Sequence, residues 1–349
     1  MRIPFLAPSP DEVVPLWRNP EVGFLDWLIQ LVFPTLAPFG SMTRAYERDD
    51  PTKLHKLRAK FDRLDARQHD KMLAKWKVTE LSIPSTDGTQ LPVILCRPPG
   101  ATDDELLPVV VWAHGGGMTI GAARSMYGAG CALELLKLCG PRFAWASVNY
   151  RLAPEHAWPA GPRDYFAALE YFQSGACAGI DGASIHAAGN SAGAGVAAAA
   201  VSAAVRSGVV VRSLMVDIPM IDPACDRPSF TTHGATTIAP VDWVRWSWSA
   251  CYPRGRVDDE AGRWLVLPEL VAPANLEPAG PHPPTVVMTC SADPLRDEGR
   301  AYAEAMRQAG KLVAHVEAKG GHALWRLDGR AAREVMAAWA GMLCGSEES

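Results

Sequence analysis

Apolar and polar residues alternate regularly along most of this chain. From about residue 78 onward, short apolar runs bounded by turn residues are separated by stretches with helical periodicity. The runs that we predict to be strands are Val78–Ile83, Leu91–Arg97, Val109–His114, Phe143–Asn149, Ser184–Ala188, Ser213–Ile218, Thr285–Cys290 and Leu312–Val316. The central runs are almost entirely apolar, as burial on both faces of a sheet requires. The pattern predicts an α/β fold with a mostly parallel eight-stranded sheet and helices on both faces.

Two parts of the chain interrupt this alternation. Residues 1 to about 75 have a helical pattern without strands. An amphipathic stripe is predicted there from Leu54, Leu57, Phe61 and Leu64, at i, i+3, i+7 and i+10. The second interruption lies between about Pro219 and Pro284 and contains Trp243, Trp246 and Trp248. An insertion at that point emerges at the carboxyl edge of the sheet, where α/β proteins place their sites.

The segment from Ala187 to Ala194 contains a Gly-x-Ser-x-Gly motif with Ser191 at its centre. An apolar strand pattern precedes the motif, and an Ala-rich helix pattern over Val196–Val205 follows it. In this strand–turn–helix context, the serine sits on a sharp turn with its hydroxyl clear of the sheet. The motif alone is weak, because a chain rich in Ala and Gly produces it by chance. Other segments must therefore support it.

Two segments offer an oxyanion loop and an acid. His114-Gly115-Gly116-Gly117 follows a buried strand, and its amides are unshielded by side chains, so they can face a developing oxyanion. A plain flexible turn is the alternative. Asp293 stands at the carboxyl end of a late strand, where a carboxylate can orient a histidine. Asp297 and Glu298 fall in the first turn of the next helix, and we expect them to cap it.

A general base is predicted at His322, within Gly320-Gly321-His322 on a loop after the last strand. His315 lies inside that strand pattern, and His156 precedes the serine. The chain order Ser191, Asp293, His322 is that of α/β-hydrolases. We expect the segment around His156 to be structural, holding a turn through Arg151 and Glu155.

Together these segments resemble the hormone-sensitive-lipase-like branch of the α/β-hydrolases, which includes bacterial and fungal carboxylesterases. Tyr150-Arg151-Leu152-Ala153-Pro154-Glu155-His156 is similar to a stretch of that branch, and the resemblance covers roughly residues 78–340. It implies a nucleophile, a base, an orienting acid and an oxyanion hole: Ser191, His322, Asp293, and the amides of Gly116, Gly117 and Ala192. Gly115 is a further candidate donor. The chain departs from the family at Asn190 (usually Asp), Ala194 (usually Gly) and Leu324 (often Phe).

In that family, N-terminal helices and an insertion form a lid over the serine. The resemblance thus implies a catalytic domain of residues 76–218 and 285–349, with a cap formed by residues 1–75 and the insertion 219–284. Trp243 and Trp246 then either pack in the core of the cap or line the acyl or alcohol pocket. The two roles are compatible.

Composition bears on the partners, the location and the cofactors that we expect for this protein. The net charge of −4 and the pI near 6.1 give no reason to expect nucleic acid as a partner. The eight cysteines form no C-x-x-C pair or metal-like cluster, so we expect buried free thiols, a cytoplasmic location, no metal and no cofactor. The apolar stretch from Val22 to Phe39 contains Asp26 and two prolines, which disfavours a membrane span; contact with a membrane surface remains an alternative.

The expected function is hydrolysis of a carboxylic ester through an acyl-enzyme. The substrate is expected to be a small to medium apolar or aromatic ester, since the chain has twelve tryptophans and an apolar lid. An acyltransferase or lactone hydrolase using the same triad is the main alternative. A non-catalytic receptor, like the plant gibberellin receptors of this fold, is disfavoured because those have lost the catalytic histidine. A homodimer through the last strand or helix is left open.

Overall fold

The computed structural model describes residues 51–102, 104–234, 238–251 and 282–345. The stretch Val22–Phe39 and most of the predicted insertion therefore lie outside the described residues. Within the described ranges, no helix is long and apolar enough to cross a membrane.

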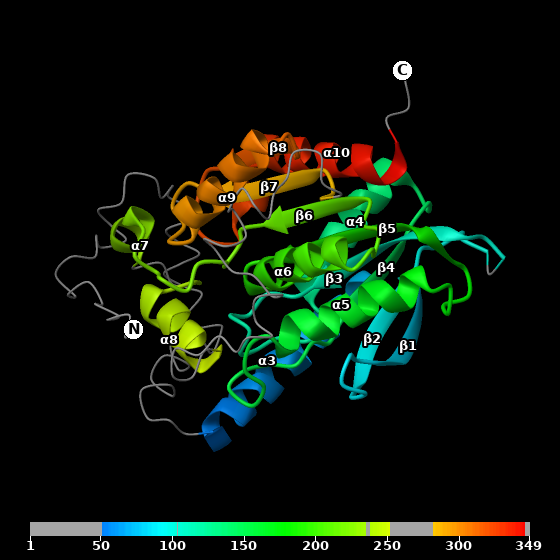
Figure 1. The fold of residues 1–349 in the computed structure, drawn as a ribbon, viewed down its shortest axis with the longest axis horizontal. Coiled ribbons are helices and arrows are strands. Elements are labelled where there is room, and N and C mark those ends of the chain that lie inside the picture. The colour runs from blue at the N-terminus through cyan, green and yellow to red at the C-terminus, as the bar shows by residue number, and fades with distance from the viewer. Residues whose placement is uncertain (1–50, 103, 235–237, 252–281, 346–349) are drawn as a thin grey trace.

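One eight-stranded sheet forms the centre of the molecule (Figure 1). Its strands are β1 (Lys77–Pro84), β2 (Gln90–Arg97), β3 (Leu107–Ala113), β4 (Ala144–Val148), β5 (Ile180–Asn190), β6 (Ser213–Asp217), β7 (Thr285–Cys290) and β8 (Leu312–Ala318). Their order is β1-β2-β4-β3-β5-β6-β7-β8. The pairs β1–β2 and β2–β4 are antiparallel, and the pairs from β4 to β8 are parallel. All eight predicted strands are present, and the predicted fold class is confirmed.

Helices cover both faces of the sheet. They are α3 (Pro51–Met72), α4 (Met126–Cys139), α5 (Ala160–Gln173), α6 (Ala192–Arg206), α7 (Pro228–His233), α8 (Val241–Cys251), α9 (Arg296–Gln308), the 3-10 helix η5 (Trp325–Leu327) and α10 (Gly329–Cys344). Residues of α5, α6, α8 and α9 share one core cluster, and residues of α4 and α10 share the other. In Figure 1, α5 and α6 lie in front of the sheet and α4 lies behind it.

Strand β3 shows why its sequence is a continuous apolar run. Val109 and Val111 belong to the cluster on the α5–α6 side, whereas Val110 and Trp112 belong to the cluster on the α4–α10 side. Successive side chains of a strand point to opposite faces, so a strand covered on both faces needs apolar residues at every position. Strand β3 is fourth in the strand order, so the glycine loop at its carboxyl end lies near the centre of the sheet.

The amphipathic stripe predicted for α3 is confirmed at Leu54 and Phe61 but is wrong at Leu64. Leu54 is buried, but Leu64 is 52% exposed. The buried face continues instead through Asp65 and His69, which are 8% and 1% exposed. Eleven residues bring a helix position back to nearly the same side, whereas ten do not. The pattern of apolar residues missed this face because polar side chains occupy it.

The expectation that all eight cysteines are free thiols is wrong for one pair. Cys139 and Cys344 form a disulfide between residues whose Cα atoms are 6.0 Å apart. They end α4 and α10, which pack on the same face of the sheet. The two residues are 205 positions apart in sequence, so only the fold brings them together. The remaining six cysteines are buried and form no disulfide.

Candidate active site

Ser191 occupies the tight turn between β5 and α6. Its φ of 54° lies in the left-handed region, which is uncommon for a residue with a side chain and strains the backbone. A Cβ on Gly189 would lie 2.4 Å from the carbonyl oxygen of Gly193, and a Cβ on Gly193 would lie 2.2 Å from the carbonyl oxygen of Ala113. The two glycines of the motif are therefore required by close backbone approach. The Ser191 amide donates to the Asp217 carbonyl at 2.8 Å, which fixes the turn against β6.

The structure brings Ser191, Asp293 and His322 together. They follow the carboxyl ends of strands β5, β7 and β8, respectively. His322 Nε2 lies 2.9 Å from Ser191 Oγ, and His322 Nδ1 lies 2.7 Å from Asp293 Oδ2. The side chains are almost fully buried, with 5%, 4% and 1% of Ser191, His322 and Asp293 exposed. With Nδ1 donating to the carboxylate, Nε2 is free to accept the serine proton. His156, the other candidate base considered, is not in contact with the serine hydroxyl.

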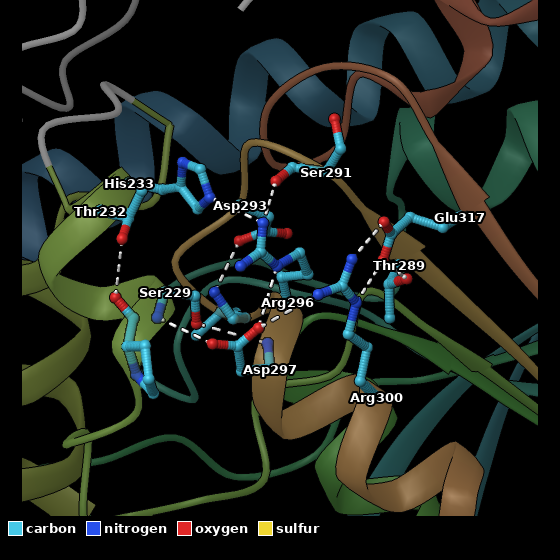
Figure 2. A network of polar contacts seen from close by, with 12 residues as sticks. Ser229, Thr232, His233, Thr289, Ser291, Asp293, Arg296, Asp297, Arg300 and Glu317 are labelled. Atoms are coloured by element: carbon cyan, nitrogen blue, oxygen red, sulfur yellow. Dashed lines mark hydrogen bonds and ion pairs between the residues drawn. The ribbon is translucent and has the colours of Figure 1, made fainter. Parts of the chain in front are cut away.

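A polar network holds the loop that carries Asp293 (Figure 2). Asp293 Oδ1 accepts from the Leu295 amide at 2.9 Å, which fixes the orientation of the carboxylate. Arg296 donates to the Ser291 carbonyl and to Asp297 Oδ1, both at 2.9 Å. Asp297 Oδ2 accepts from the Ser229 amide at 2.9 Å, so the network reaches α7 in the predicted insertion. The acid loop is therefore anchored on both sides.

Asp297 and Glu298 lie in the first turn of α9, as predicted, where negative charge suits the helix dipole; the N-cap residue Leu295 itself offers no side-chain hydrogen bond. Asp297 binds α7 and the two arginines Arg296 and Arg300. Glu298 is fully buried and accepts from the Ile221 amide at 2.9 Å. Burial raises the pKa of Glu298 well above its ordinary value. Both side chains thus accept hydrogen bonds from backbone amides of the chain segment that follows β6.

The glycine loop lies against the serine turn. The Gly115 amide donates to Asn190 Oδ1 at 2.9 Å, so it is not available to an oxyanion. In the described part of the chain, no acceptor engages the amides of Gly116, Gly117 or Ala192. These three amides were the donors predicted from the sequence. Asn190, noted as a departure from the family, thus has a defined contact, which holds the loop.

His114 begins this loop, and its imidazole ring is uncharged. Its ring stacks on Tyr150 with centroids 4.3 Å apart, and the Tyr150 hydroxyl donates to the His114 carbonyl at 2.6 Å. Burial lowers the pKa of His114 to about 4, so the ring is neutral at physiological pH. The loop therefore relies on its amides rather than on an imidazolium to face negative charge.

A pocket of about 740 Å³, counted with its open mouth, adjoins Ser191 and His322. Gly115 and Gly116 line it, and so do the apolar side chains of Phe61, Ile120, Tyr127, Trp243 and Ala323. Of the two tryptophans predicted for this role, Trp243 lines the pocket, while Trp246 packs against the core and is not part of the lining. Phe61 and Tyr127 carried no motif; Phe61 was assigned only to the stripe of a helix.

Another buried carboxyl group, which the sequence did not single out, is linked to the segment after His322. Asp217 ends β6 and is 1% exposed, and its Oδ2 accepts from the Tyr127 hydroxyl at 2.7 Å. Trp325, three residues after His322, donates its indole N–H to the same hydroxyl. Burial raises the pKa of Asp217 to about 6. These contacts join β6, α4 and η5 beneath the pocket.

Arg151 is structural, as predicted from the sequence. It pairs with Asp164 at 2.8 Å and with Asp87 at 2.7 Å. Glu155 has a different partner, since it pairs with Arg58 of α3 at 2.7 Å. Over the ranges that the structure describes, no group of three or more His, Cys, Asp or Glu side chains could hold a metal ion.

Comparisons with known proteins agree with this geometry. A model of the α/β-hydrolase fold matches residues 110–325. Carboxylesterase NlhH of Mycobacterium tuberculosis is 33% identical over 246 residues, which are 69% of this chain and 73% of that protein. The ethyl acetate hydrolase of Pseudomonas putida is 30% identical over 68% of this chain and 71% of that protein. A bacterial heroin esterase structure has a TM-score of 0.68 and 31% identity, covering 89% of this chain and 99% of that one. This chain therefore belongs to the hormone-sensitive-lipase-like branch of the α/β-hydrolase family and is a serine carboxylic-ester hydrolase.

Proposed function

We propose that Ser191 is the nucleophile of this ester hydrolase, His322 its general base and Asp293 the orienting acid. His322 Nε2 takes the serine proton as Oγ attacks the ester carbonyl. The amides of Gly116, Gly117 and Ala192 donate to the resulting oxyanion. The alcohol leaves with the proton from His322, and a water molecule, activated by the same imidazole, then hydrolyses the acyl-enzyme.

The continuous contact from carboxylate to imidazole to hydroxyl carries this proposal. The two distances, 2.7 Å and 2.9 Å, are those of direct hydrogen bonds. Three side chains that are far apart in sequence meet in this way beside a loop with free amides. A non-catalytic receptor has no need for such an arrangement. Acyl transfer uses the same groups, and product analysis with an added alcohol distinguishes it from hydrolysis.

Replacing the serine tests the proposal. Ser191→Ala is expected to lower kcat for p-nitrophenyl butyrate by several orders of magnitude, because the remaining groups cannot form the acyl-enzyme. Ser202→Ala is the matched control, since Ser202 is also buried and lies on α6, the helix that follows Ser191. It should retain wild-type turnover. Wild-type turnover by Ser191→Ala, with an unchanged melting temperature, would contradict the assignment.

The substrate that we propose is a small to medium apolar or aromatic ester. Phe61, Ile120 and Trp243 supply apolar walls to the pocket beside Ser191, as in sites that take apolar small molecules. We also propose that residues 1–75 and 219–284 form a cap. Phe61 on α3 and Trp243 on α8 support this, because both line the pocket beside Ser191. A series of p-nitrophenyl esters of increasing acyl length measures the size of the site.

A cytoplasmic location belongs to the same proposal. The six buried cysteines outside any disulfide support it, whereas the Cys139–Cys344 disulfide is of the kind usual in oxidising compartments. Cell fractionation followed by immunodetection of the protein tests the location. The homodimer that the sequence leaves open is tested by the mass of the protein in light scattering.

A further inference from the structure

One acidic side chain in the pocket has no role in the proposed chemistry. Asp65 of α3 lines the same pocket as Ser191 and His322 and is 8% exposed. Its Oδ1 accepts from the Met126 amide at 2.8 Å, at the start of α4. In the described structure no hydrogen bond or ion pair engages Oδ2. One oxygen of a carboxylate that is nine-tenths buried is therefore left for a ligand.

Among the described residues, no lysine, arginine or histidine forms an ion pair with this carboxylate. Arg58, two turns earlier on α3, donates instead to Glu155 and to the carbonyl oxygens of Thr119 and Ala153. Asp62, one turn before Asp65, adds a second carboxyl group, and its Oδ1 is buried without a partner. The α4 N-terminus stabilises part of the charge through Oδ1 alone. A buried carboxylate without a full set of partners is costly to keep, and a cationic ligand would offset that cost.

The rest of the lining also favours a cation. The pocket is lined by no lysine and no arginine from the described residues, and His114 is neutral at physiological pH. Burial raises the pKa of Asp65 to about 6, so its carboxyl group is ionised at pH 7.5. Phe61 and Trp243 line the same space, and aromatic faces attract ammonium groups, whereas the Tyr127 ring already contacts Trp112 and Arg326.

We propose that this pocket selects esters that carry a protonated amine or quaternary ammonium group, with Asp65 as the counter-ion. The inference rests on the proposed function, because turnover through Ser191 is its readout. It narrows the substrate class from apolar or aromatic esters to those that combine an apolar body with a positive charge.

A pair of substrates that differ only in charge tests this inference. Butyrylthiocholine carries a trimethylammonium group, and S-(3,3-dimethylbutyl) thiobutyrate replaces its nitrogen with carbon. Release of the thiol gives kcat/KM for both. The wild-type enzyme is expected to favour the cationic thioester by roughly tenfold or more, as a charge-assisted contact with an ionised carboxylate would give. A wild-type ratio near one would overturn the inference.

Asp65→Asn keeps an oxygen for the Met126 amide but removes the charge, so the ratio of the two kcat/KM values should fall towards one. Asp70→Asn is the matched control, because Asp70 is on the same helix but is exposed and paired with Arg124. It should leave the ratio unchanged. A preserved ratio in Asp65→Asn, with a wild-type melting temperature, would overturn the inference. Loss of both activities in Ser191→Ala tests the proposed function separately, so the two failures are distinguishable.

Discussion

Replacing Asp293 with asparagine is expected to trap His322 in the wrong tautomer. Asp293 Oδ1 accepts from the Leu295 amide at 2.9 Å, and Oδ2 faces His322 Nδ1 at 2.7 Å. In Asp293→Asn, the side-chain oxygen stays with the Leu295 amide, because that amide can only donate. The NH₂ group then faces Nδ1 and donates to it. The imidazole hydrogen moves to Nε2, which can no longer accept the proton of Ser191.

The loss expected from this change is large. An analogous substitution in a serine protease triad lowers kcat by about 10⁴-fold, which corresponds to about 5.5 kcal/mol of activation free energy. We expect a loss of the same order here, because the geometry of the Asp293 carboxyl group forces the same tautomer. Asp293→Ala removes the donor as well as the acceptor, so its histidine is free to choose either tautomer. Asp293→Asn should therefore be at least as impaired as Asp293→Ala.

The assay is steady-state hydrolysis of p-nitrophenyl butyrate by wild type and both variants, with melting temperatures measured in parallel. Folded Asp293→Asn that keeps kcat within tenfold of wild type would refute the tautomer argument. An Asp293→Asn variant clearly more active than Asp293→Ala would refute the orientation assigned to the amide.

Two further substitutions test the packing around the site. Gly193→Ala would place a Cβ 2.2 Å from the Ala113 carbonyl oxygen, so we expect a loss of about 3 kcal/mol in the free energy of unfolding and reduced kcat. Gly341→Ala, where a Cβ meets nothing within 4 Å, should be neutral or stabilising, and equal losses in urea denaturation would contradict the steric argument. Folded Asp217 keeps its proton up to about pH 6, against 3.8 for its ordinary pKa, so rising pH destabilises the wild type across this window. Relative to wild type, Asp217→Asn should gain about 2 kcal/mol between pH 4 and pH 7 in urea unfolding, and a pH-independent difference would contradict the assigned pKa.

The sheet and the serine turn could be predicted from the sequence because their signals are local. A strand buried on both faces, such as β3, must be apolar throughout, and the Gly189 and Gly193 contacts arise within one turn and its neighbouring strand. The order of Ser191, Asp293 and His322 then followed from the known topology of the family. These features depend on residue type and on position along one element.

The rest depends on contacts between distant segments. The Asp217–Tyr127 contact joins β6 to α4 across 90 positions, and no pattern along either element marks it. A polar residue, Asp65, occupies a position on the buried face of α3, so hydrophobic periodicity pointed to its neighbour Leu64 instead. Trp246 could not be separated from Trp243 by sequence, because both lie on one short aromatic helix and only packing decides which reaches the pocket.

The central claim is that His322 and Asp293 activate Ser191. The most direct measurement is labelling with a fluorophosphonate probe, followed by mass spectrometry of the digested protein, because only an activated serine reacts rapidly. The account predicts one phosphonate adduct, located on Ser191, and a strong reduction of its rate of formation in His322→Ala. An unlabelled Ser191 in enzyme that hydrolyses p-nitrophenyl butyrate, or equal labelling rates in wild type and His322→Ala, would contradict it.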